Sequence, residues 1–506
     1  MPFPEKQDEK SPWPPMALGA DRKALAEASA WYSDDIDTLE SFYASDSPTG
    51  RNGGQMWWSR RAADKNSSLQ RVHVPIASDM AQVSSDLLFG EDVEVTPESN
   101  MSEAEQDAAN KAIEAVVEEI QLMPTLVEAA ETAAGVAGVF LVPTWDEEGP
   151  VLRVLQPDVA VPVWENRRLM EVIFWSVVHT RTPDRKSVYR HLEKWDKAGV
   201  EHRLYLGTDD TIGTQVDLAM SPATADLEET MEMPIDRMAV EYVPNMLPVR
   251  KNRSSKWGRA DSAGSESMMD ALDEAMTSWM RDIRLGQSRL LMPDEYLMSG
   301  RTGTTRNRGG GKGFDLDAEL IMPLDVDPRD QEKAGITEIQ FSIRTADHEA
   351  TVLRLIDQIV TSGGYSSQTF GIGVDGSAES GTALRIKEKR TYRTRAKKIR
   401  YWRPAISRVM EVSLAIWADQ FAIGSPVFRP QVAFPQPDES DISELAASLE
   451  VFGRAQAMSL RTRVGMAQPH LTAVELDAEV ASIQAETGAL VNGPPEADIA
   501  HDGIVF

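Results

Sequence analysis

The spacing of apolar residues changes partway along the chain, and this change constrains the fold more than any single motif does. Up to about residue 134, apolar residues recur every three or four positions, which is typical of amphipathic helices. Between residues 138 and 206, apolar and polar residues alternate in short runs separated by turns, which predicts strands. Helices followed by strands predict an α+β domain over residues 1–260. The helices are expected at residues 23–44, 75–89 and, interrupted at Pro124, 102–134, with a short strand at 93–95.

The helical spacing returns after residue 264. Residues 265–285 and 345–360 are expected to form two helices, with Ser265 or Ser267 capping the first and Thr345 the second. Two strands, at 289–292 and 336–343, are expected between them, around a glycine-rich basic segment. The two helices should therefore be joined by a small β-rich insertion.

The remainder of the chain is predicted to be largely helical. A glycine- and serine-rich loop is followed by a long helix over residues 382–420, which Pro404 is expected to kink. The second half of that helix is apolar enough to be buried. A strand at 427–434 and two or three acidic helices over 437–491 complete the prediction.

Composition excludes several classes of protein. With 506 residues, 42% of them hydrophobic, the chain can bury a sizeable core, and length alone suggests about three domains. A net charge of −28 disfavours tight wrapping of nucleic acid, although DNA could still pass the protein. The absence of cysteine excludes a disulfide scaffold, a thiol nucleophile and cysteine-ligated metals. Seven scattered histidines give little support to a histidine-based metal site.

No targeting or membrane segment is expected. The N-terminal stretch is polar and proline-rich, unlike a signal peptide. No run of about 18 apolar residues occurs that could span a membrane. We therefore expect a protein that is soluble where it is made and has no membrane partner.

Two glycine-rich motifs resemble nucleotide-binding sites. Residues 371–376 match the dinucleotide pattern GxGxxG, but a helix precedes them and no βαβ unit surrounds them. Residues 309–313 resemble a phosphate loop, but Arg306 and Gly313 break the required pattern. Metalloprotease, hydrolase and kinase signatures are also missing. The sequence therefore predicts no enzyme activity, no catalytic residues, no cofactor and no metal.

A strongly basic run leaves three interpretations open. Ten Lys or Arg residues and one Glu lie between Arg385 and Arg403. The run could be a solvated helix face, it could pair with carboxylates within or between subunits, or it could bind nucleic acid through its interleaved aromatic residues. The paired aromatics Trp31–Tyr32 and Trp57–Trp58 are expected in the core or at an interface, with the core as the default.

The order of these pieces resembles the portal proteins of tailed bacteriophages, in particular those of actinobacterial siphophages. Several local stretches carry the same resemblance, and their collinearity over about residues 20–490 gives it specificity. These stretches are residues 74–91 (VPIASDMAQVSSDLLFGE), 242–248 (YVPNMLP), 272–289 (LDEAMTSWMRDIRLGQSR), 368–371 (QTFG) with 380–384 (SGTAL), and 437–441 (PDESD).

The resemblance implies a closed ring of twelve copies at one capsid vertex. The ring would be the channel for packaging and ejecting double-stranded DNA, with a partner ATPase supplying the energy. The implied divisions are a flexible N-terminal arm (1–22), an α+β wing (23–264), a first stem helix (265–288), a β-rich clip (289–344), a second stem helix (345–363), a tunnel loop (364–381), a long wing-to-crown helix with a strand (382–436), and a helical crown with a tail (437–506).

The resemblance also implies partners and sites. Besides DNA, the partners would be the terminase large subunit, then the head–tail adaptor, and the major capsid and scaffold proteins, in the virion and in the host cytoplasm during assembly. The alternative is a soluble nucleic-acid-binding or processing factor that uses residues 385–403. The implied sites are the tunnel loop (Gly364, Tyr365, Ser366, Gln368, Phe370, Asp375, Glu379), the channel-lining stem (Asp347, Glu349, Arg354, Asp357), the clip tip (Arg301, Arg306, Arg308, Lys312) and the basic helix (Arg385, Lys387, Arg393, Arg395, Lys397, Lys398, Arg400). In the stem, Arg281, Arg284 or Arg354 would pair across subunits.

Overall fold

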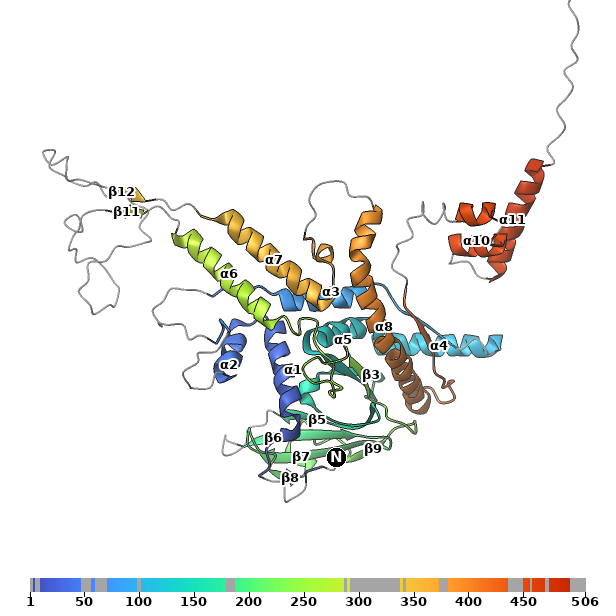
Figure 1. Cartoon of the computed structure of the whole chain (residues 1–506). Coiled ribbons are helices and arrows are strands. Elements are labelled where there is room, and N and C mark those ends of the chain that lie inside the picture. The colour runs from blue at the N-terminus through green and yellow to red at the C-terminus, as the bar shows by residue number, and fades with distance from the viewer. Residues whose placement is uncertain are drawn as a thin grey trace, which may run out of the picture. The chain divides into compact units, whose positions relative to one another are not determined.

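A computed structural model of the chain divides into two compact units, residues Met1–Phe434 and Pro435–Phe506 (Figure 1). The structure describes residues 3–4, 10–46, 56–59, 71–97, 102–178, 187–285, 289–291, 337–339, 343–372, 381–435, 449–455, 457–468 and 473–491.

The N-terminal helical region differs from the prediction at two breaks. Residues 23–44 form two helices, α1 (Gly19–Tyr32) and α2 (Ile36–Asp46), because Asp34 takes a left-handed backbone with φ 54°. The carboxylate of Asp35 then accepts a hydrogen bond from the backbone of Thr38 at 3.0 Å, which starts the new helix. Helices α4 (Glu103–Glu119) and α5 (Leu122–Val136) are separated at Gln121, φ 46°, and not at Pro124, which lies in the first turn of α5 where proline is tolerated.

Helix α3 (Ile76–Phe89) packs against α5 and follows the prediction closely. It begins after Pro75 and ends at Gly90, whose N–H bonds back to Asp86 at 2.8 Å. Helix α4 begins with the capping box of Ser102 and Glu105.

The predicted strands form two antiparallel sheets. Strands β2 (Gly138–Trp145), β3 (Pro150–Leu155) and β10 (Glu241–Pro244) form one sheet in the order β10-β2-β3. The other sheet has the order β4-β5-β6-β7-β8, with β9 also paired to β7. Its strands are β4 (Ala160–Glu165), β5 (Arg168–Val178), β6 (Val188–Trp195), β7 (Gly199–Gly207), β8 (Thr214–Val216) and β9 (Thr230–Glu232).

Two helices project from this body side by side, α6 (Glu266–Leu285) and α7 (Thr345–Gly363) (Figure 1). Beyond them, β11 (Arg289–Leu291) and β12 (Thr337–Ile339) pair antiparallel, as expected for the two strands of the insertion. Helix α6 begins directly after Ser265, as predicted. The cap of α7 is different, because Thr345 is the first helical residue and Arg344 precedes it without a side-chain cap.

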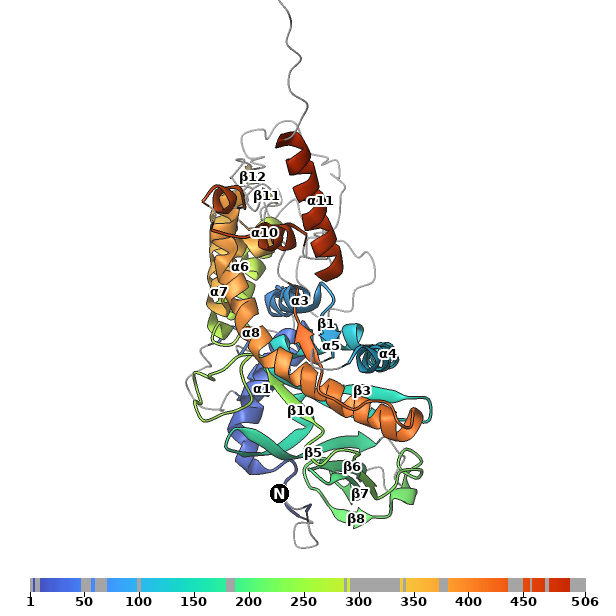
Figure 2. The ribbon, with the colours of Figure 1, turned by 90° about the vertical axis from the view of Figure 1, so that its right-hand side faces the viewer.

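The long helix α8 (Gly381–Ile416) continues through Pro404 and ends in a π-helical turn, Trp417–Phe421. Its axis changes direction partway along in both views (Figures 1 and 2), as expected of a helix that contains an internal proline. The strand predicted at 427–434 is reduced to β13 (Gln431–Ala433), which pairs with β1 (Glu94–Thr96).

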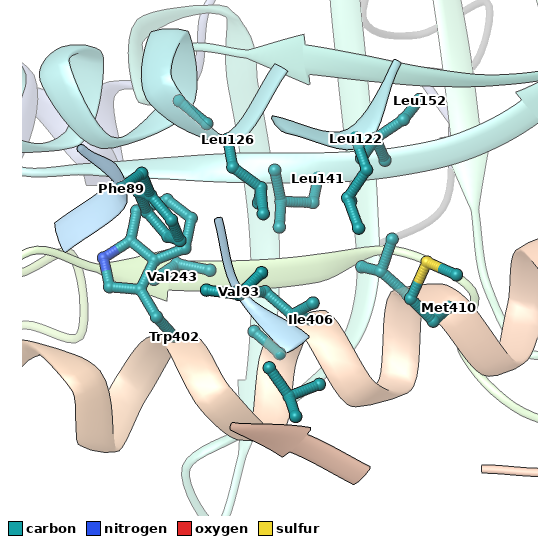
Figure 3. Packing of buried hydrophobic residues seen from close by; sticks show 14 of the residues in the cluster. Phe89, Val93, Leu122, Leu126, Leu141, Leu152, Val243, Trp402, Ile406 and Met410 are labelled. Atoms are coloured by element: carbon teal, nitrogen blue, oxygen red, sulfur yellow. The ribbon is translucent and has the colours of Figure 1, made fainter. Parts of the chain in front are cut away.

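The apolar half of α8 is buried, as predicted. Trp402, Ile406 and Met410 point toward Leu141 of β2 and Val243 of β10 in one continuous core (Figure 3). Because side chains four residues apart lie on one helix face, this half of α8 seals the three-stranded sheet. The core also takes in α3, α4 and α5.

The second unit contains α10 (Leu460–Ala467) and α11 (Ala473–Val491), linked by Arg461 and Asp477 at 2.6 Å. Within the described ranges, no helix is long and apolar enough to cross a membrane.

Candidate functional site: the projecting helix pair and its anchorage

Helices α6 and α7 run antiparallel. The start of α6 meets the end of α7 through the hydroxyls of Ser265 and Ser362. At the other end, Asp282 Oδ2 lies 2.9 Å from His348 Nε2, and this hydrogen bond lowers the pKa of the Asp282 carboxyl. The His348 ring stacks on Trp279 with 5.9 Å between ring centroids. Helices α6 and α7 are therefore joined to each other at both ends and project from the body together.

Two carboxylates in the first half of α6 bind the chain around residues 57–58 and 73–74. Asp270 accepts hydrogen bonds from the backbone N–H groups of Trp57 and Trp58 at 2.6 and 3.0 Å. Asp273 accepts from the indole of Trp58 at 3.0 Å, from the backbone of Val74 at 2.8 Å, and contacts His73 Nδ1 at 2.8 Å. Because both carboxylates are buried, their hydrogen bonds are stronger than they would be in water.

The tryptophan pair is in the core, as the default interpretation expected. Trp57 and Trp58 join α1, α3, α6 and α7 in a single apolar cluster. The sequence analysis did not single out Asp270 and Asp273. The sequence does contain a signal for them. Asp270 and Asp273 are three residues apart, which places them on the same face of α6 as the buried Met269 and Leu272.

A buried ion pair joins α8 to the segment that precedes α6. Lys398 Nζ of α8 lies 2.6 Å from Asp261 Oδ2, and it also donates to Ser84 Oγ of α3 at 2.5 Å and to the Tyr365 hydroxyl at 3.1 Å. Asp261 also accepts from Tyr365 at 2.6 Å and from Asn245 at 2.9 Å. Burial lowers the pKa of Lys398 and raises that of Tyr365 well above its usual value. This network therefore joins α3, α8, the segment before α6 and the chain just after α7.

The chain immediately after α7 is ordered by α8. Gly364 has φ 103°, and its carbonyl accepts a hydrogen bond from Thr394 Oγ1 at 2.7 Å. Thr391 Oγ1 accepts from the backbone of Ser366 at 2.9 Å and contacts Thr369 at the same distance.

The first part of the expected tunnel loop is therefore bonded to α8, where the sequence predicted only a glycine- and serine-rich loop. Tyr365 is fully buried, and its ring meets Phe370 edge-on at 6.0 Å. Gln368 and Phe370 lie in a short 3₁₀ turn, Ser367–Phe370. Asp375 and Glu379 lie outside the described residues.

The four residues proposed for the channel-lining stem differ in their surroundings. Asp347 and Glu349 are exposed in the first turns of α7. Asp357 contacts Arg354 of its own helix at 3.1 Å and accepts a hydrogen bond from Ser367. Arg354 therefore already has a partner within its own chain, where a partner across subunits was expected.

The basic run is not a uniform solvated face. Lys398 is buried in the network above, and Arg395 Nε donates to the carbonyl of Leu87 at 2.5 Å. Arg393, Lys397 and Arg400 are exposed. Of the three interpretations, pairing with a carboxylate within the chain therefore holds for Lys398. The side chains of Arg385 and Lys387 lie outside the description, as do Arg301, Arg306, Arg308 and Lys312 of the expected clip tip.

An α+β body, a projecting antiparallel helix pair and a long helix returning beneath it form the arrangement that the resemblance led us to expect of a portal protein. Residues 26–484 match the family model described as "Phage portal protein, SPP1 Gp6-like". The match covers most of the chain, which therefore belongs to this family. No curated protein matches the chain.

Three solved structures illustrate the structural likeness. One chain comes from "Virion of native gene transfer agent (GTA) particle", with 12% identity, TM-score 0.37, and coverage of 80% of this chain and 88% of that one. Chains from "Neck of native GTA particle computed with C12 symmetry" (10%, TM-score 0.34) and "Neck of empty GTA particle computed with C6 symmetry" (13%, TM-score 0.37) have the same coverage.

Family membership sets the function at its coarse level. The chain is a portal, a structural component of the phage virion through which DNA is packaged and ejected. The nucleic-acid-processing alternative is not favoured. The predicted lack of enzyme activity stays a prediction.

Proposed function

We propose that twelve copies form a closed ring in which α6 and α7 line the DNA channel. The observation that carries this proposal is the anchored helix pair, which is buried at its base, around Met269, Leu272 and Ile359, and is more exposed toward its far end. Exposed acids, Asp347 and Glu349, suit a channel that DNA must traverse without binding tightly, because like charges repel phosphate.

A head-to-tail interface is needed to close such a ring. Leu353 of α7 and Ile283 of α6 are 43% and 42% exposed, which leaves apolar surface for the helix pair of a neighbouring copy. In this proposal the exposed Arg281 would form an ion pair across that interface.

The finer division of the chain belongs to the same proposal. Residues 23–264 would be the wing, 265–288 and 345–363 the stem, 289–344 the clip, 364–381 the tunnel loop, 382–436 the connection to the crown, and 437–506 the crown. The clip would receive the terminase large subunit and later the head–tail adaptor. Major capsid and scaffold proteins would contact the ring during assembly in the host cytoplasm.

Ring formation is tested by light scattering and negative-stain microscopy of the purified protein. The expected result is a particle with a central hole and a mass of roughly 0.6–0.7 MDa, about twelve chains in a closed cyclic assembly. A particle that stays a single chain even after scaffold and capsid proteins are added would contradict the proposal.

The channel lining is tested by single-cysteine labelling, which is straightforward because the chain has no cysteine. Glu349→Cys is expected to react with a bulky maleimide in particles emptied of DNA and to be protected in filled particles. Glu147→Cys, exposed in the turn between β2 and β3, is the control and should react equally in both. Equal labelling of Glu349→Cys in filled and empty particles would show that α7 does not face the DNA.

A further inference from the structure

The pairing of β6 with β7 brings together two histidines and a glutamate, His191, His202 and Glu193. His191 and Glu193 are two residues apart on β6, so they point to the same face of the sheet. Glu193 is paired directly with His202 of β7. All three side chains therefore share one face of the six-stranded sheet, in a part of the molecule remote in sequence from α6 and α7.

The spacing of their atoms suits a shared cation. His191 Nε2 and His202 Nδ1 share a hydrogen bond of 3.1 Å, and one ligand atom from each of the three residues lies within 4.8 Å of the others. Two nitrogens bound to one zinc ion are separated by roughly 3 Å, given Zn–N bonds of about 2.0–2.1 Å. Only modest side-chain rotation is then needed to close a site.

The chemistry of the three side chains also suits metal binding. They offer two imidazoles and one carboxylate, which are groups that bind first-row transition metals.

Arg153 of β3 is the group that would compete for the carboxylate. Its Nη1 and Nη2 lie 2.9 and 3.2 Å from the two oxygens of Glu193. The Arg153 side chain is 36% exposed and that of Glu193 is 12% exposed, so Arg153 has more freedom to move outward when a cation binds.

A cavity lies beside one of the three residues. Strand β7 pairs with β8 at residues 204–206 and with β9 at residues 199–201, which leaves His202 and Arg203 between the two partners. A cavity of about 790 Å³ has His202, Glu201 and Glu229 in its lining, together with Arg203, which pairs with Glu201.

We propose that His191, Glu193 and His202 form a binding site for one divalent first-row transition metal ion per chain, with Zn²⁺ the leading candidate. Two imidazoles with one carboxylate are a ligand set for zinc and its neighbours in the series, and hard cations such as Mg²⁺ would prefer oxygen ligands alone. The site is separate from the channel, so bound metal would cross-link β6 to β7 and stiffen the sheet.

The test uses full-length protein stripped with a chelator and then titrated with Zn²⁺ and Cu²⁺. We expect one Zn²⁺ per chain by calorimetry, and nitrogen coupling from two imidazoles in the electron paramagnetic resonance spectrum of the Cu²⁺-loaded wild type. His202→Ala should weaken binding at least 100-fold. His348→Ala, which removes a histidine on α7, is the matched control and should bind as the wild type does. The absence of stoichiometric binding, or coupling from fewer than two imidazoles, would overturn the proposal.

A second variant separates a ligand role for Glu193 from a structural one. Arg153→Ala frees the carboxylate, so we expect Zn²⁺ affinity to rise about tenfold, and Glu193→Gln in the same background should abolish the gain. Unchanged affinity in Arg153→Ala would remove Glu193 from the ligand set and overturn the three-residue site. Circular dichroism melts of each stripped variant establish that the sheet is folded.

Discussion

Lys398 Nζ on α8 lies 2.6 Å from Asp261 Oδ2, and both side chains are no more than 2% exposed. Removing one partner of such a pair leaves a buried charge without compensation, which costs about 3–5 kcal/mol. Lys398→Met should therefore lower the free energy of unfolding of the Met1–Phe434 unit by about that amount, measured by urea denaturation. The exposed neighbour Lys397 provides the control. Lys397→Met should change the free energy of unfolding by no more than about 0.5 kcal/mol.

The double variant Lys398→Met with Asp261→Asn extends this prediction. Because both charges are removed together, its loss of stability should be clearly smaller than the sum of the two single losses. Additive losses would show that the two residues act independently, which would contradict the ion pair as the source of the effect.

Asp273→Ala should detach the chain at Trp58, His73 and Val74 from α6. The change leaves one buried group and two part-buried groups without an acceptor, and an unsatisfied buried group costs about 1–3 kcal/mol. We expect a loss of about 3–5 kcal/mol in the free energy of unfolding and a rise in fluorescence quenching of Trp58 by acrylamide. Ser278→Ala, at an exposed position on the same helix, should alter neither quantity.

His73 should make stability depend on pH. Burial alone would lower its pKa, but the hydrogen bond to Asp273 and the charges of Asp273 and Asp34 raise it above 6.5. The folded state therefore holds the proton more tightly than the unfolded state does. The resulting stabilisation is fully present below about pH 6.5 and is lost as pH rises through the folded-state pKa. His73→Gln should destabilise the protein more at pH 6 than at pH 9, and an equal loss at both values would refute this account.

Two glycines just after α7 offer a matched comparison. Both have left-handed backbones, which cost a residue with a side chain about 1–2 kcal/mol. A Cβ at Gly364 would also lie 2.8 Å from Thr394 Oγ1, whereas one at Gly371 would have nothing within 4 Å. Gly364→Ala should therefore lower the melting temperature more than Gly371→Ala does, as measured by differential scanning calorimetry. Equal shifts would mean that the contact with α8 does not constrain this turn.

Much of the secondary structure followed from local sequence. The alternating strands between residues 138 and 206, helix α3 and helix α6 all form where the apolar spacing predicted them, because their buried faces are continuous in sequence. The break at Asp34 was missed, and the break at Gln121 was placed three residues too late, because each depends on a left-handed residue other than glycine, which composition does not mark. The basic run also divided in a way its composition did not reveal, since Lys398 is internal while Lys397 is exposed.

The sequence by itself determined the class of fold and the family, because the order of helices, strands and insertion is a one-dimensional property. Tertiary structure decided which polar and charged residues are buried together. Asp261 and Lys398 are 137 positions apart, Trp58 and Asp273 are 215 apart, and His191 and His202 meet only through the pairing of β6 with β7. No local pattern can specify such partners, because their burial depends on apolar surfaces from several elements closing around them. For Asp261 and Lys398, this burial is the reason that each charge requires the other.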